Sequence, residues 1–435
     1  MELNVIAQAN SLKDKTVARR RDFHKYAETA WTEFRTAAVI ADTLTDLGYQ
    51  VSVGDEVIEE QSMMGVPSAD ELARHAERAL AQGANWHWVE KMQGGKTGVI
   101  GVLQGGKPGP TVALRFDIDS NDAIEADSAE HRPAREGFAS VNKGAMHACG
   151  HDGHAAIGLA VAEVLASRRN ELCGAVKLIF QPAEEGVRGA RAMVAKGVVD
   201  DADYLLGLHL GFSTKKNGQL ACRVEGFLAT AKLDAVFTGV PAHAGAAPEA
   251  GRNALLAAAT ASLNLHAIAR HSQGPSRINV GRLEAGTGRN VLPANAIIKL
   301  ETRGTTSTIN EFMYTEAVRI IKASATMYGV EVDIREMGGA ASAENDPCLA
   351  EIIEQVAGEL GLFEEILPSC YLGGSEDCTY FMERVQQRGG KAVYMMVGTE
   401  LKAGHHDFRF DFDEAVLPKA VALVSAAVIR LLQEK

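Results

Sequence analysis

The sequence is poor in cysteine and aromatic residues and has no long apolar run. Six cysteines scattered over 435 residues do not have the dense spacing of a disulfide framework, so we expect a reducing, cytoplasmic location. No stretch of 18 apolar residues occurs, which argues against a membrane-spanning helix and a membrane partner. The first residues lack the basic-then-apolar pattern of a secretory signal, and we expect no such leader.

Basic residues are also fewer than acidic residues. Lys and Arg number 44 against 56 Asp and Glu, which gives a net charge of −12. Proteins that bind nucleic acid through its phosphates normally carry a basic surface, so we expect no nucleic-acid partner. Hydrophobic residues make up 46% and charged residues 23% of the chain, which is typical of a folded globular protein. The length corresponds to two or three domains.

Short apolar runs alternate with helical patterns over most of the chain. The first 50 residues have helical periodicity, and so does the segment 154–167. Nearly unbroken apolar runs are typical of strands that are buried on both faces. Strands that alternate with helices in this way predict an α/β sheet covered by helices on both faces. The strands are expected at 112–116, 176–180, 204–210 and 393–397.

The stretch from 229 to 339 has a different pattern, and we expect it to form a separate domain inserted into a first domain of residues 1–228 and 340–435. Its strands and helices follow the order β-α-β-β-α-β, which is the ferredoxin-like plan. Thr308 and Glu311 have the spacing of a capping box, which predicts that the second helix begins near residue 309. The expected elements are 231–238, 253–269, 277–283, 296–302, 309–328 and 330–335.

The segment 56–95 fits neither domain. It is polar, has a helical pattern over 69–82, and includes Trp86 and Trp88. We interpret it as an insertion between strands. It is either a surface excursion or a wall of the substrate pocket, where two Trp side chains would suit an aromatic ligand.

The string MHACGHDGH at 146–154 contains the densest group of chemically active side chains. Three His, a Cys and an Asp lie there just before a helical pattern. Thiolate and imidazole are strong ligands for zinc-like metals, so the string favours a metal site. A cysteine nucleophile with a nearby His is the alternative.

Other candidate ligands follow or end the predicted strands. The pair Glu184-Glu185 follows one strand, His209 lies in another, and Asp117 and Asp119 follow a third. The carboxyl ends of parallel strands meet at one edge of a sheet, where α/β proteins bind ligands. His405 and His406 follow the strand 393–397 in the same way. The set provides enough ligands for two metal ions: Cys149, His151, Glu185, His209 and His406.

With these residues, the chain resembles the aminoacylase/carboxypeptidase-G family of co-catalytic metallohydrolases in peptidase clan MH. It is most similar to the Cys-containing subgroup of hippurate and auxin-conjugate hydrolases. The similarity extends over nearly the whole chain. It is carried by RRDFH at 20–24 with Glu28 and Glu33, RFDID at 115–119, MHACGHDGH at 146–154, FQPAEEG at 180–186, AHAG at 242–245, NVLPA at 290–294, GSED at 374–377 and the segment 406–414.

The resemblance assigns roles to individual residues. It implies a zinc-peptidase-like catalytic domain and a lid or dimerisation domain at 229–339. Glu184 corresponds to the general base, and His243 to a lid residue that stabilises the oxyanion, often across a dimer. Asn290 and Arg303 correspond to lid residues that contact the substrate. The implied metal ligands are Cys149, His151, Glu185, His209 and His406.

Two positions depart from the subgroup's pattern. Asp119 is followed by Ser120-Asn121 where the subgroup has Ala-Leu-Pro, and Phe408 stands where a proline follows the last ligand. The first departure concerns the shape of the pocket and the second the geometry of a loop. Neither removes a ligand.

The resemblance implies a metal-dependent amidohydrolase with two divalent ions, zinc or manganese, with cobalt as a further option. The segment 63–67 and the string GFAS at 137–140 resemble the branch that acts on p-aminobenzoyl-glutamate and indole-3-acetyl-aspartate. We therefore expect a small-molecule substrate with an aromatic acyl group and an acidic amino acid. A broad N-acyl amino acid hydrolase, like the aminoacylases and hippuricases, is an alternative. So is one component of a hetero-oligomeric hydrolase.

We expect a homodimer, or a heterodimer with a related chain. The alternative that is not an enzyme is a noncatalytic component or a binding protein, and the intact ligand set argues against it.

Overall fold

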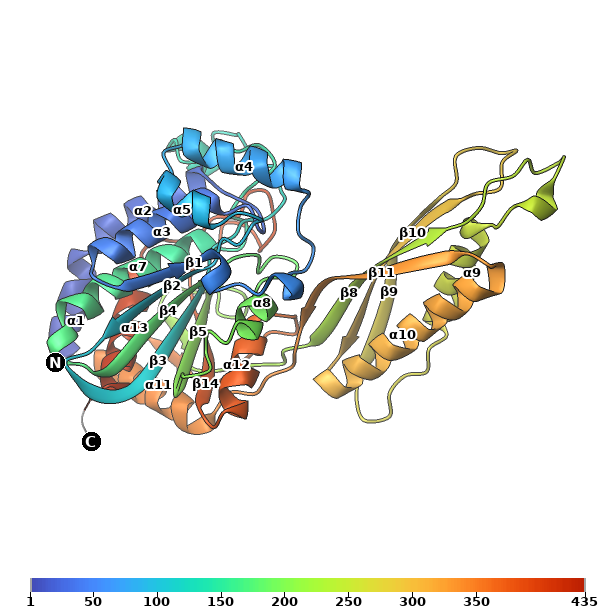
Figure 1. Cartoon of the computed structure of the whole chain (residues 1–435). Helices are drawn as coiled ribbons and strands as arrows, with labels where there is room; N and C mark the ends of the chain where they lie inside the picture. Colours follow the sequence, from blue (N-terminus) through green and yellow to red (C-terminus); the bar gives the residue numbers. More distant parts are fainter. Residues whose placement is uncertain (1, 434–435) are drawn as a thin grey trace. The chain divides into compact units, whose positions relative to one another are not determined.

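The structure is a computed structural model that describes residues 2–433, and these form two compact units (Figure 1). The first unit comprises Met1–Gly226, Ala343–Gly373 and Asp377–Lys435. The second comprises Phe227–Ser342 and Gly374–Glu376, so it is inserted into the first.

An eight-stranded mixed sheet forms the centre of the first unit, in the order β1-β2-β4-β3-β5-β14-β6-β12. Its four middle strands, β4, β3, β5 and β14, are parallel, and they contain the four apolar runs of the sequence. The strands of this sheet are β1 Gln50–Val53, β2 Val99–Gln104, β3 Lys107–Asp117, β4 Cys173–Gln181, β5 Tyr204–Leu210, β6 Gln219–Ala221, β12 Glu365–Leu367 and β14 Lys391–Val397. Separately, β7 Val224–Glu225 pairs with β13 Cys370–Tyr371.

Helices cover both faces of this sheet. On β5, Leu206 and Leu208 pack in the core with α7, whereas Gly207 points the other way, toward Cys378 of α12. The helices of the unit are α1 Glu2–Ser11, α2 Lys13–Lys25, α3 Phe34–Asp46, α4 Ala69–Ala81, α5 Trp86–Lys91, α6 Arg132–Arg135, α7 His151–Ser167, α8 Ala190–Ala195, α11 Pro347–Leu360, α12 Cys378–Gln387 and α13 Val416–Leu431, with short 3-10 turns at Gly54–Glu56, Glu60–Ser62 and Arg169–Glu171.

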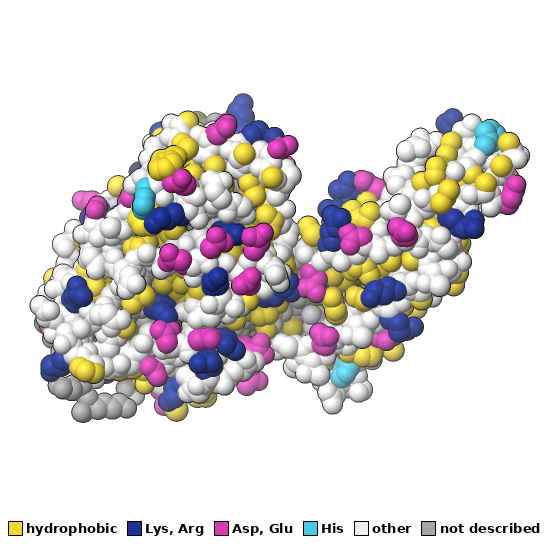
Figure 2. Space-filling model, viewed as in Figure 1, with side chains coloured by type: hydrophobic (Ala, Val, Ile, Leu, Met, Phe, Trp, Pro, Cys, Tyr) yellow, Lys and Arg dark blue, Asp and Glu magenta, His cyan; other side chains and the backbone are white. Residues whose placement is uncertain are grey.

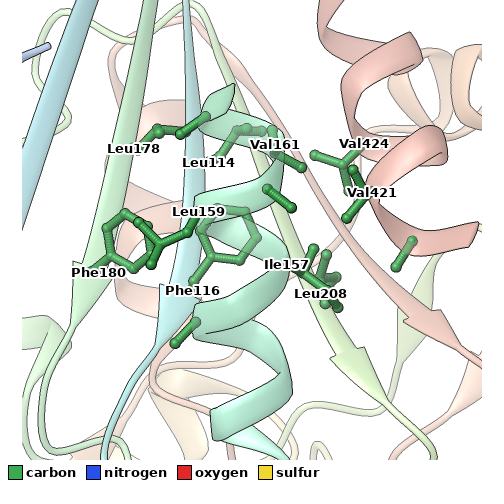
Figure 3. Packing of buried hydrophobic residues seen from close by; sticks show 14 of the residues in the cluster. Leu114, Phe116, Ile157, Leu159, Val161, Leu178, Phe180, Leu208, Val421 and Val424 are labelled. Atoms are coloured by element: carbon green, nitrogen blue, oxygen red, sulfur yellow. The ribbon is translucent and has the colours of Figure 1, made fainter. Parts of the chain in front are cut away.

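Small residues on α7 allow this helix to lie very close to the sheet. Phe116 and Phe180, from neighbouring strands, stack with ring centroids 5.6 Å apart under the helix (Figure 3). A Cβ at Gly158 would lie 2.7 Å from the Phe180 ring and 2.8 Å from the Phe116 ring, so any side chain there would push the helix away. Gly158 therefore fixes the distance between α7 and the ends of β3 and β4.

The second unit has the predicted ferredoxin-like order, with a four-stranded antiparallel sheet in the order β11-β8-β10-β9. The α/β fold class with an inserted β-α-β-β-α-β unit is therefore confirmed. The elements are β8 Ala229–Thr238, a 3-10 turn at Pro248–Ala250, α9 Ala254–His266, β9 Ser276–Ala285, β10 Asn295–Gly304, α10 Ser307–Tyr328 and β11 Glu331–Ala340.

The predicted capping box of α10 is wrong. The helix begins at Ser307, and its N-cap is Thr306, whose side chain accepts a hydrogen bond from the Ile309 backbone N–H at 3.2 Å. Thr306 has the extended backbone that an N-cap requires. Thr308 lies inside the first turn, where it cannot cap the helix.

The segment 56–95 lies between β1 and β2 and carries α4 and α5. Trp88 packs in the core, and its indole N–H donates to Asp42 at 2.7 Å. Trp86 is 60% exposed. The two Trp side chains thus have different surroundings, and Trp88 serves the packing of α5 against α3 rather than a ligand wall.

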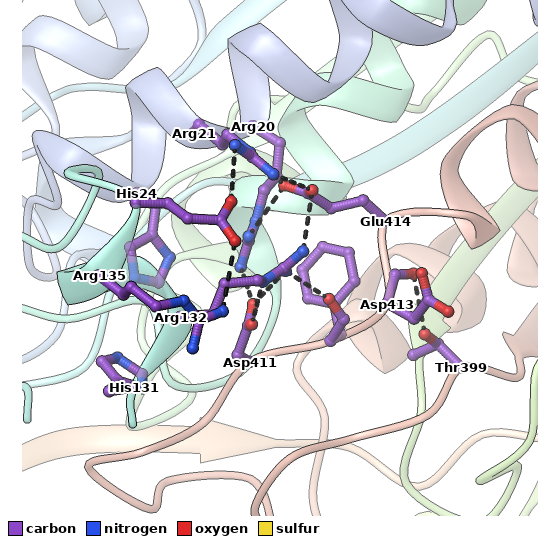
Figure 4. Close-up of polar contacts among 12 residues, drawn as sticks. Arg20, Arg21, His24, His131, Arg132, Arg135, Thr399, Asp411, Asp413 and Glu414 are labelled. Carbon is purple, nitrogen blue, oxygen red and sulfur yellow. Dashed lines mark hydrogen bonds and ion pairs between the residues drawn. The ribbon is translucent and has the colours of Figure 1, made fainter. Parts of the chain in front are cut away.

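A buried ion network joins the N-terminal helix α2 to the chain beyond β14 (Figure 4). Arg20 is fully buried and donates to Asp152, Asp411 and Glu414 at 2.8, 3.0 and 3.2 Å. Arg132 donates to both oxygens of Asp411, at 2.6 and 2.7 Å. Buried charges of this kind are tolerated when each has partners, and here the charged side chains come from four separate segments, at Arg20, Arg132, Asp152 and 411–414.

Acidic and basic side chains are interspersed over the visible face of the molecule (Figure 2). Among the described residues, no helix has both the length and the apolar character needed to cross a membrane.

The buried ion network leads to a testable prediction about how the free energy of unfolding depends on pH. Burial disfavours the His24 imidazolium, but hydrogen bonds to Asp152 and Glu125 at 2.8 and 2.9 Å outweigh it and raise the pKa of His24 above 6.5. The stabilisation is therefore complete below pH 6.5 and is lost as pH rises through the higher folded-state pKa. Urea unfolding should show that His24→Gln lowers the free energy of unfolding more at pH 5.5 than at pH 9.

The exposed His87→Gln variant is the control and should change stability little at either pH. An equal or larger effect of His24→Gln at pH 9 would contradict the assignment.

Candidate metal centre

Six of the predicted site residues lie together at the carboxyl edge of the parallel strands. Cys149 and His151 are at the start of α7, and Glu184 and Glu185 are in the turn after β4. His209 is in β5, and His406 is in the loop after β14. Ligand atoms within 4.8 Å of one another form three overlapping groups: Cys149, His151 and His209; Cys149, Glu185 and His406; and His151, Glu184 and Glu185.

The topology of the sheet explains why these segments meet. β4 and β5 lie on opposite sides of β3, so the connections from β3 and β4 leave the sheet in different directions. A crevice forms where the strand order switches in this way, outside the carboxyl ends of the strands. The residues lie around that crevice because each follows or ends one of these strands.

Pairs of potential ligands in the cluster are separated by distances at which a cation can lie between them. The Cys149 Sγ atom is 3.5 Å from His209 Nε2, and Glu185 Oε1 is 3.4 Å from His406 Nε2. On the other side, Glu184 Oε2 is 4.0 Å from His151 Nε2. Glu184 is therefore paired most closely with His151 and Glu185 with His406, although the Glu185 carboxylate also lies within 4.8 Å of His151.

His151 and His209 present the same ring nitrogen, Nε2, to the other side chains of the cluster. His151 Nδ1 lies 3.0 Å from the Asp119 backbone oxygen, and His209 Nδ1 lies 2.8 Å from the Leu210 backbone oxygen. Each Nδ1 therefore carries the proton, which leaves the Nε2 lone pair as the ligand atom. This is the usual arrangement of metal-binding imidazoles in proteins.

The structure distinguishes the three histidines of the 146–154 string. Both ring nitrogens of His154 are in use, because Nδ1 lies 2.5 Å from Asp117 and Nε2 accepts the Leu210 backbone N–H. His147 belongs to none of the ligand groups and lies beside His24, with ring centroids 6.2 Å apart. Only His151 presents a nitrogen to the cluster.

His405 and His406 are likewise distinguished. The His405 ring stacks on Phe212 at 3.8 Å, and its Nε2 bonds to the Leu210 backbone oxygen. Burial lowers the pKa of His405 to about 4. His406 is 58% exposed at its side chain and points its Nε2 toward Glu185.

The residues present fit divalent metal ions. Within residues 2–433, His151 Nε2 and Glu185 Oε1 are buried atoms without a hydrogen bond, and Glu185 Oε1 has an ion-pair contact with His406 Nε2 at 3.4 Å. Leaving such atoms without a partner is costly, and a cation is a partner that both can accept. Thiolate, imidazole and carboxylate together are the donor set of zinc and similar ions.

The environment of Cys149 argues against a cysteine nucleophile. Burial, and next the Glu185 carboxylate, raise the pKa of the Cys149 thiol well above its ordinary value. A nucleophilic cysteine needs a lowered pKa, because the thiolate is the reactive form. A bound cation reverses the effect, since it stabilises the thiolate that ligates it.

Asp119 is a functional residue that the sequence patterns did not assign. Its Oδ1 is 3.3 Å from His151 Nδ1, and its Oδ2 accepts the Glu185 backbone N–H at 2.8 Å. It therefore orients one ligand and the backbone of another. The sequence signals were its position after a strand and its place in the RFDID motif, and neither could reveal partners 32 and 66 residues away.

The remaining predicted residues are in the second unit. His243 and Asn290 lie side by side on neighbouring loops, because His243 bridges to Val291 and the Ala244 N–H donates to the Asn290 backbone oxygen at 2.9 Å. Arg303 is on β10, where it forms a two-point pair with Glu301 at 3.0 and 3.1 Å.

Arg303 and His243 are at opposite ends of the second unit's sheet. Arg303 pairs with Thr230 at the start of β8, whereas His243 follows the end of β8 at Thr238. Eight residues of extended chain correspond to about 26 Å. A single copy of this unit therefore cannot present both side chains to one small substrate.

Comparison with known proteins identifies a family. The profile of the Peptidase family M20/M25/M40 matches residues 113–430. A p-aminobenzoyl-glutamate hydrolase chain of Escherichia coli, named as one of that enzyme's subunits, is 51% identical over 421 residues, which are 97% of this chain and 96% of the relative. The indole-3-acetyl-aspartic acid hydrolase of Enterobacter agglomerans is 51% identical over 411 residues, 94% of each chain.

A solved structure has the same fold. The crystal structure of an aminobenzoyl-glutamate utilization protein from Klebsiella pneumoniae is 42% identical and superposes with a TM-score of 0.84, over 97% of each chain.

The site predicts how activity responds to chelation and to thiol reagents. A chelator should abolish hydrolysis of N-acyl amino acids, and added zinc or manganese should restore it, because the activity depends on the cluster's ligands holding metal. Iodoacetamide should leave the metal-loaded protein active, since Cys149 is only 5% exposed. Product release followed by chromatography measures both.

The exposed Cys348 is the obvious target of the reagent, so Cys348→Ser is the matched control. Activity that survives the chelator and is lost on alkylation of Cys348→Ser would identify a cysteine hydrolase instead.

Proposed function

The chain belongs to the Peptidase family M20/M25/M40, and we propose that it hydrolyses the amide bond between an aromatic acyl group and an acidic amino acid. Membership of the family and the two hydrolase relatives confirm the prediction of a metal-dependent amidohydrolase. The substrate proposal is supported by the names of those relatives. p-Aminobenzoyl-glutamate and indole-3-acetyl-aspartate both consist of an aromatic acyl group joined to an acidic amino acid.

The observation that carries the proposal is the cluster of six side chains at the sheet edge. Five are assigned to the metal site and one to proton transfer. When bound, two divalent ions polarise the amide carbonyl and lower the pKa of a water molecule in the site. The five proposed ligands are Cys149, His151, Glu185, His209 and His406.

Glu184 is the proposed general base. It directly precedes the ligand Glu185, yet it faces His151, whereas Glu185 faces His406. A carboxylate beside the ligands, but not needed as one, can accept the proton of the attacking water. The same carboxylic acid then protonates the leaving nitrogen, which is the usual second half of such catalysis.

The metal is proposed to be zinc or manganese. A thiolate and imidazoles favour zinc, whereas carboxylates also suit manganese, and cobalt accepts the same donors. Metal content of the protein as purified distinguishes these ions.

In the second unit, His243 is proposed to stabilise the oxyanion. Its Nδ1 accepts the backbone N–H groups of Gly245 and Ala246, at 3.2 and 3.1 Å. The ring proton is therefore on Nε2, and the exposed side chain can donate it to a negatively charged oxygen. Asn290, on the adjacent loop, is proposed to contact the same part of the substrate.

Arg303 is proposed to bind the substrate carboxylate, for which the pair with Glu301 must open. Because Arg303 and His243 lie at opposite ends of β8, which spans about 26 Å between Thr230 and Thr238, we propose that they reach one active site from two different chains. That proposal requires a dimer in which the second unit serves as the lid and dimerisation domain.

The partner is either a second copy or a related chain. A homodimer satisfies the geometry. A heterodimer is favoured by one observation, namely that the Escherichia coli relative is named as one of its enzyme's subunits. A broad N-acyl amino acid hydrolase is the alternative specificity. We also propose a cytoplasmic location, in keeping with six cysteines among the described residues, none of which forms a disulfide.

Side-by-side hydrolysis of p-aminobenzoyl-glutamate and indole-3-acetyl-aspartate tests the substrate and the base. The metal-loaded protein should hydrolyse at least one of them faster than N-acetyl-leucine, an acyl amino acid that is neither aromatic nor acidic. Glu184→Gln should lower kcat by about 10²- to 10⁴-fold, the usual contribution of a general base. The exposed Glu130→Gln is the control and should retain full activity.

Rapid hydrolysis of N-acetyl-leucine with little turnover of the other two would establish the broad specificity instead. An active Glu184→Gln variant would rule out the assigned base. If neither candidate substrate is hydrolysed until a related chain is added, the heterodimer is established.

Mixing of two variants tests the role of His243. Glu184→Gln and His243→Ala should each be nearly inactive as homodimers. If His243 acts across the interface, a mixed dimer contains one site with both groups intact, so an equal mixture should recover about a quarter of wild-type activity. Refolding the two variants together, followed by the hydrolysis assay, measures this. No recovery in verified mixed dimers would place His243 in its own chain's site.

A further inference from the structure

Two buried glutamates in the connection between α2 and α3 have almost the same chemistry but different partners. Glu28 and Glu33 are both fully buried, and each accepts three hydrogen bonds. Glu28 accepts from the Arg35 and Thr36 backbone N–H groups and from the Thr36 hydroxyl, all at the start of α3. Glu28 is therefore a support for the helix. Glu33 reaches further, to the loop that carries Glu184.

That loop, residues 182–189, is held together by backbone hydrogen bonds to Ala183. The Ala183 backbone oxygen accepts the N–H groups of Arg188 and Gly189 at 3.0 and 2.9 Å. Ala183 has a φ of +54° and Val187 a φ of +57°, in the left-handed region that residues with a Cβ rarely adopt. Strained residues persist only where their surroundings hold them, and they gather at functional sites. The two strained residues flank Glu184 and Glu185.

Glu33 holds the strained residue that directly precedes Glu184. Its Oε1 accepts the Ala183 backbone N–H at 2.8 Å and the Trp31 backbone N–H at 3.1 Å. Trp31 is also left-handed, with a φ of +67°. The other oxygen, Oε2, accepts the Thr97 hydroxyl at 2.6 Å, which fixes the carboxylate in place.

The far end of the loop is fixed independently. Asp377 accepts the backbone N–H groups of Gly189 and Ala190 at 3.1 and 3.0 Å. In addition, a Cβ at Gly189 would lie 1.8 Å from the Pro182 backbone oxygen, so the two ends of the loop are in close contact. With the far end anchored, the direction in which Glu184 leaves the loop depends on the Ala183 backbone.

We propose that Glu33 is a positioning residue for Glu184, because it holds Ala183 in the left-handed conformation that makes Glu184 face His151. The Glu185 backbone N–H is held separately, by Asp119. The inference rests on the proposed role of Glu184 as general base. Glu33 acts through hydrogen bonding rather than charge. A side chain of the same size that can still accept the Ala183 N–H should therefore preserve the geometry.

Five variants test this, two of them at Glu33. Glu33→Met removes the acceptor at nearly constant volume, and Glu33→Gln keeps one acceptor oxygen for Ala183 while its amide can donate to Thr97. Glu33→Met should lower kcat about 10- to 100-fold, the size of effect expected from a small misplacement of a catalytic group. KM and bound metal should change less than about threefold, because neither depends on the direction of Glu184. Glu33→Gln should restore kcat to near the wild-type value.

Glu28→Met and Glu28→Gln are the matched controls, since they make the same chemical changes at a buried carboxylate that supports α3 and pairs with Arg78 rather than with the loop 182–189. Glu28→Met should lower the melting temperature and leave kcat within about twofold of wild type when assayed well below that temperature. If Glu33→Met fails to fold, Thr97→Val removes the hydroxyl that fixes Glu33 and should produce a smaller loss of kcat, again with KM unchanged.

The outcomes separate this inference from the proposed function. Wild-type kcat in both Glu33→Met and Thr97→Val would overturn the positioning role, and so would a kcat loss in Glu33→Met that parallels loss of metal or is matched by Glu28→Met. Those results leave the base intact as long as Glu184→Gln is inactive in the same assay. A fully active Glu184→Gln would instead remove the base on which the inference rests.

Discussion

The central constraint on this structure is that carboxyl and thiol groups lie together in a buried crevice. In their ionised forms these groups repel one another, so the arrangement requires compensating positive charge. Burial raises the pKa of Cys149, Asp119 and Glu33, and neighbouring carboxylates raise each of them further. Such groups resist ionisation together unless cations lie between them. Divalent ions held by the proposed ligands would supply that charge, and they would thereby also stabilise the arrangement of those side chains.

The rest of the first unit holds this cluster rigid. Gly158 brings α7 close to β3 and β4, and α7 begins with His151, a proposed ligand. Asp152, the next residue, is tied to Arg20 and His24, which belong to the buried network that also reaches Asp411. Asp119 and Glu33 then set the histidine and the glutamate loop. Each support comes from a different part of the chain, so the geometry of the site is a property of the whole unit.

The sequence predicted the strands and most helices because their apolar runs and periodicity are local signals. It predicted the cluster because ligands at several strand ends must meet at one sheet edge. The family resemblance selects His151 among the histidines 147, 151 and 154. Residue type alone does not distinguish them, because their surroundings depend on Asp117, Asp119 and Leu210 in other segments. The cap of α10 was misplaced because Thr306 and Thr308 are equally good caps by residue type. The function of Glu33 depends on a partner 150 residues away, which leaves no local pattern.

The most direct test of this account is the position of the metal. Crystals grown with manganese, measured for anomalous scattering, should show two peaks in each chain. One should lie among Cys149, His151 and His209, and the other beside Glu185 and His406. Peaks elsewhere, or none at the sheet edge in an active, metal-loaded protein, would contradict the assignment of the cluster as the metal centre.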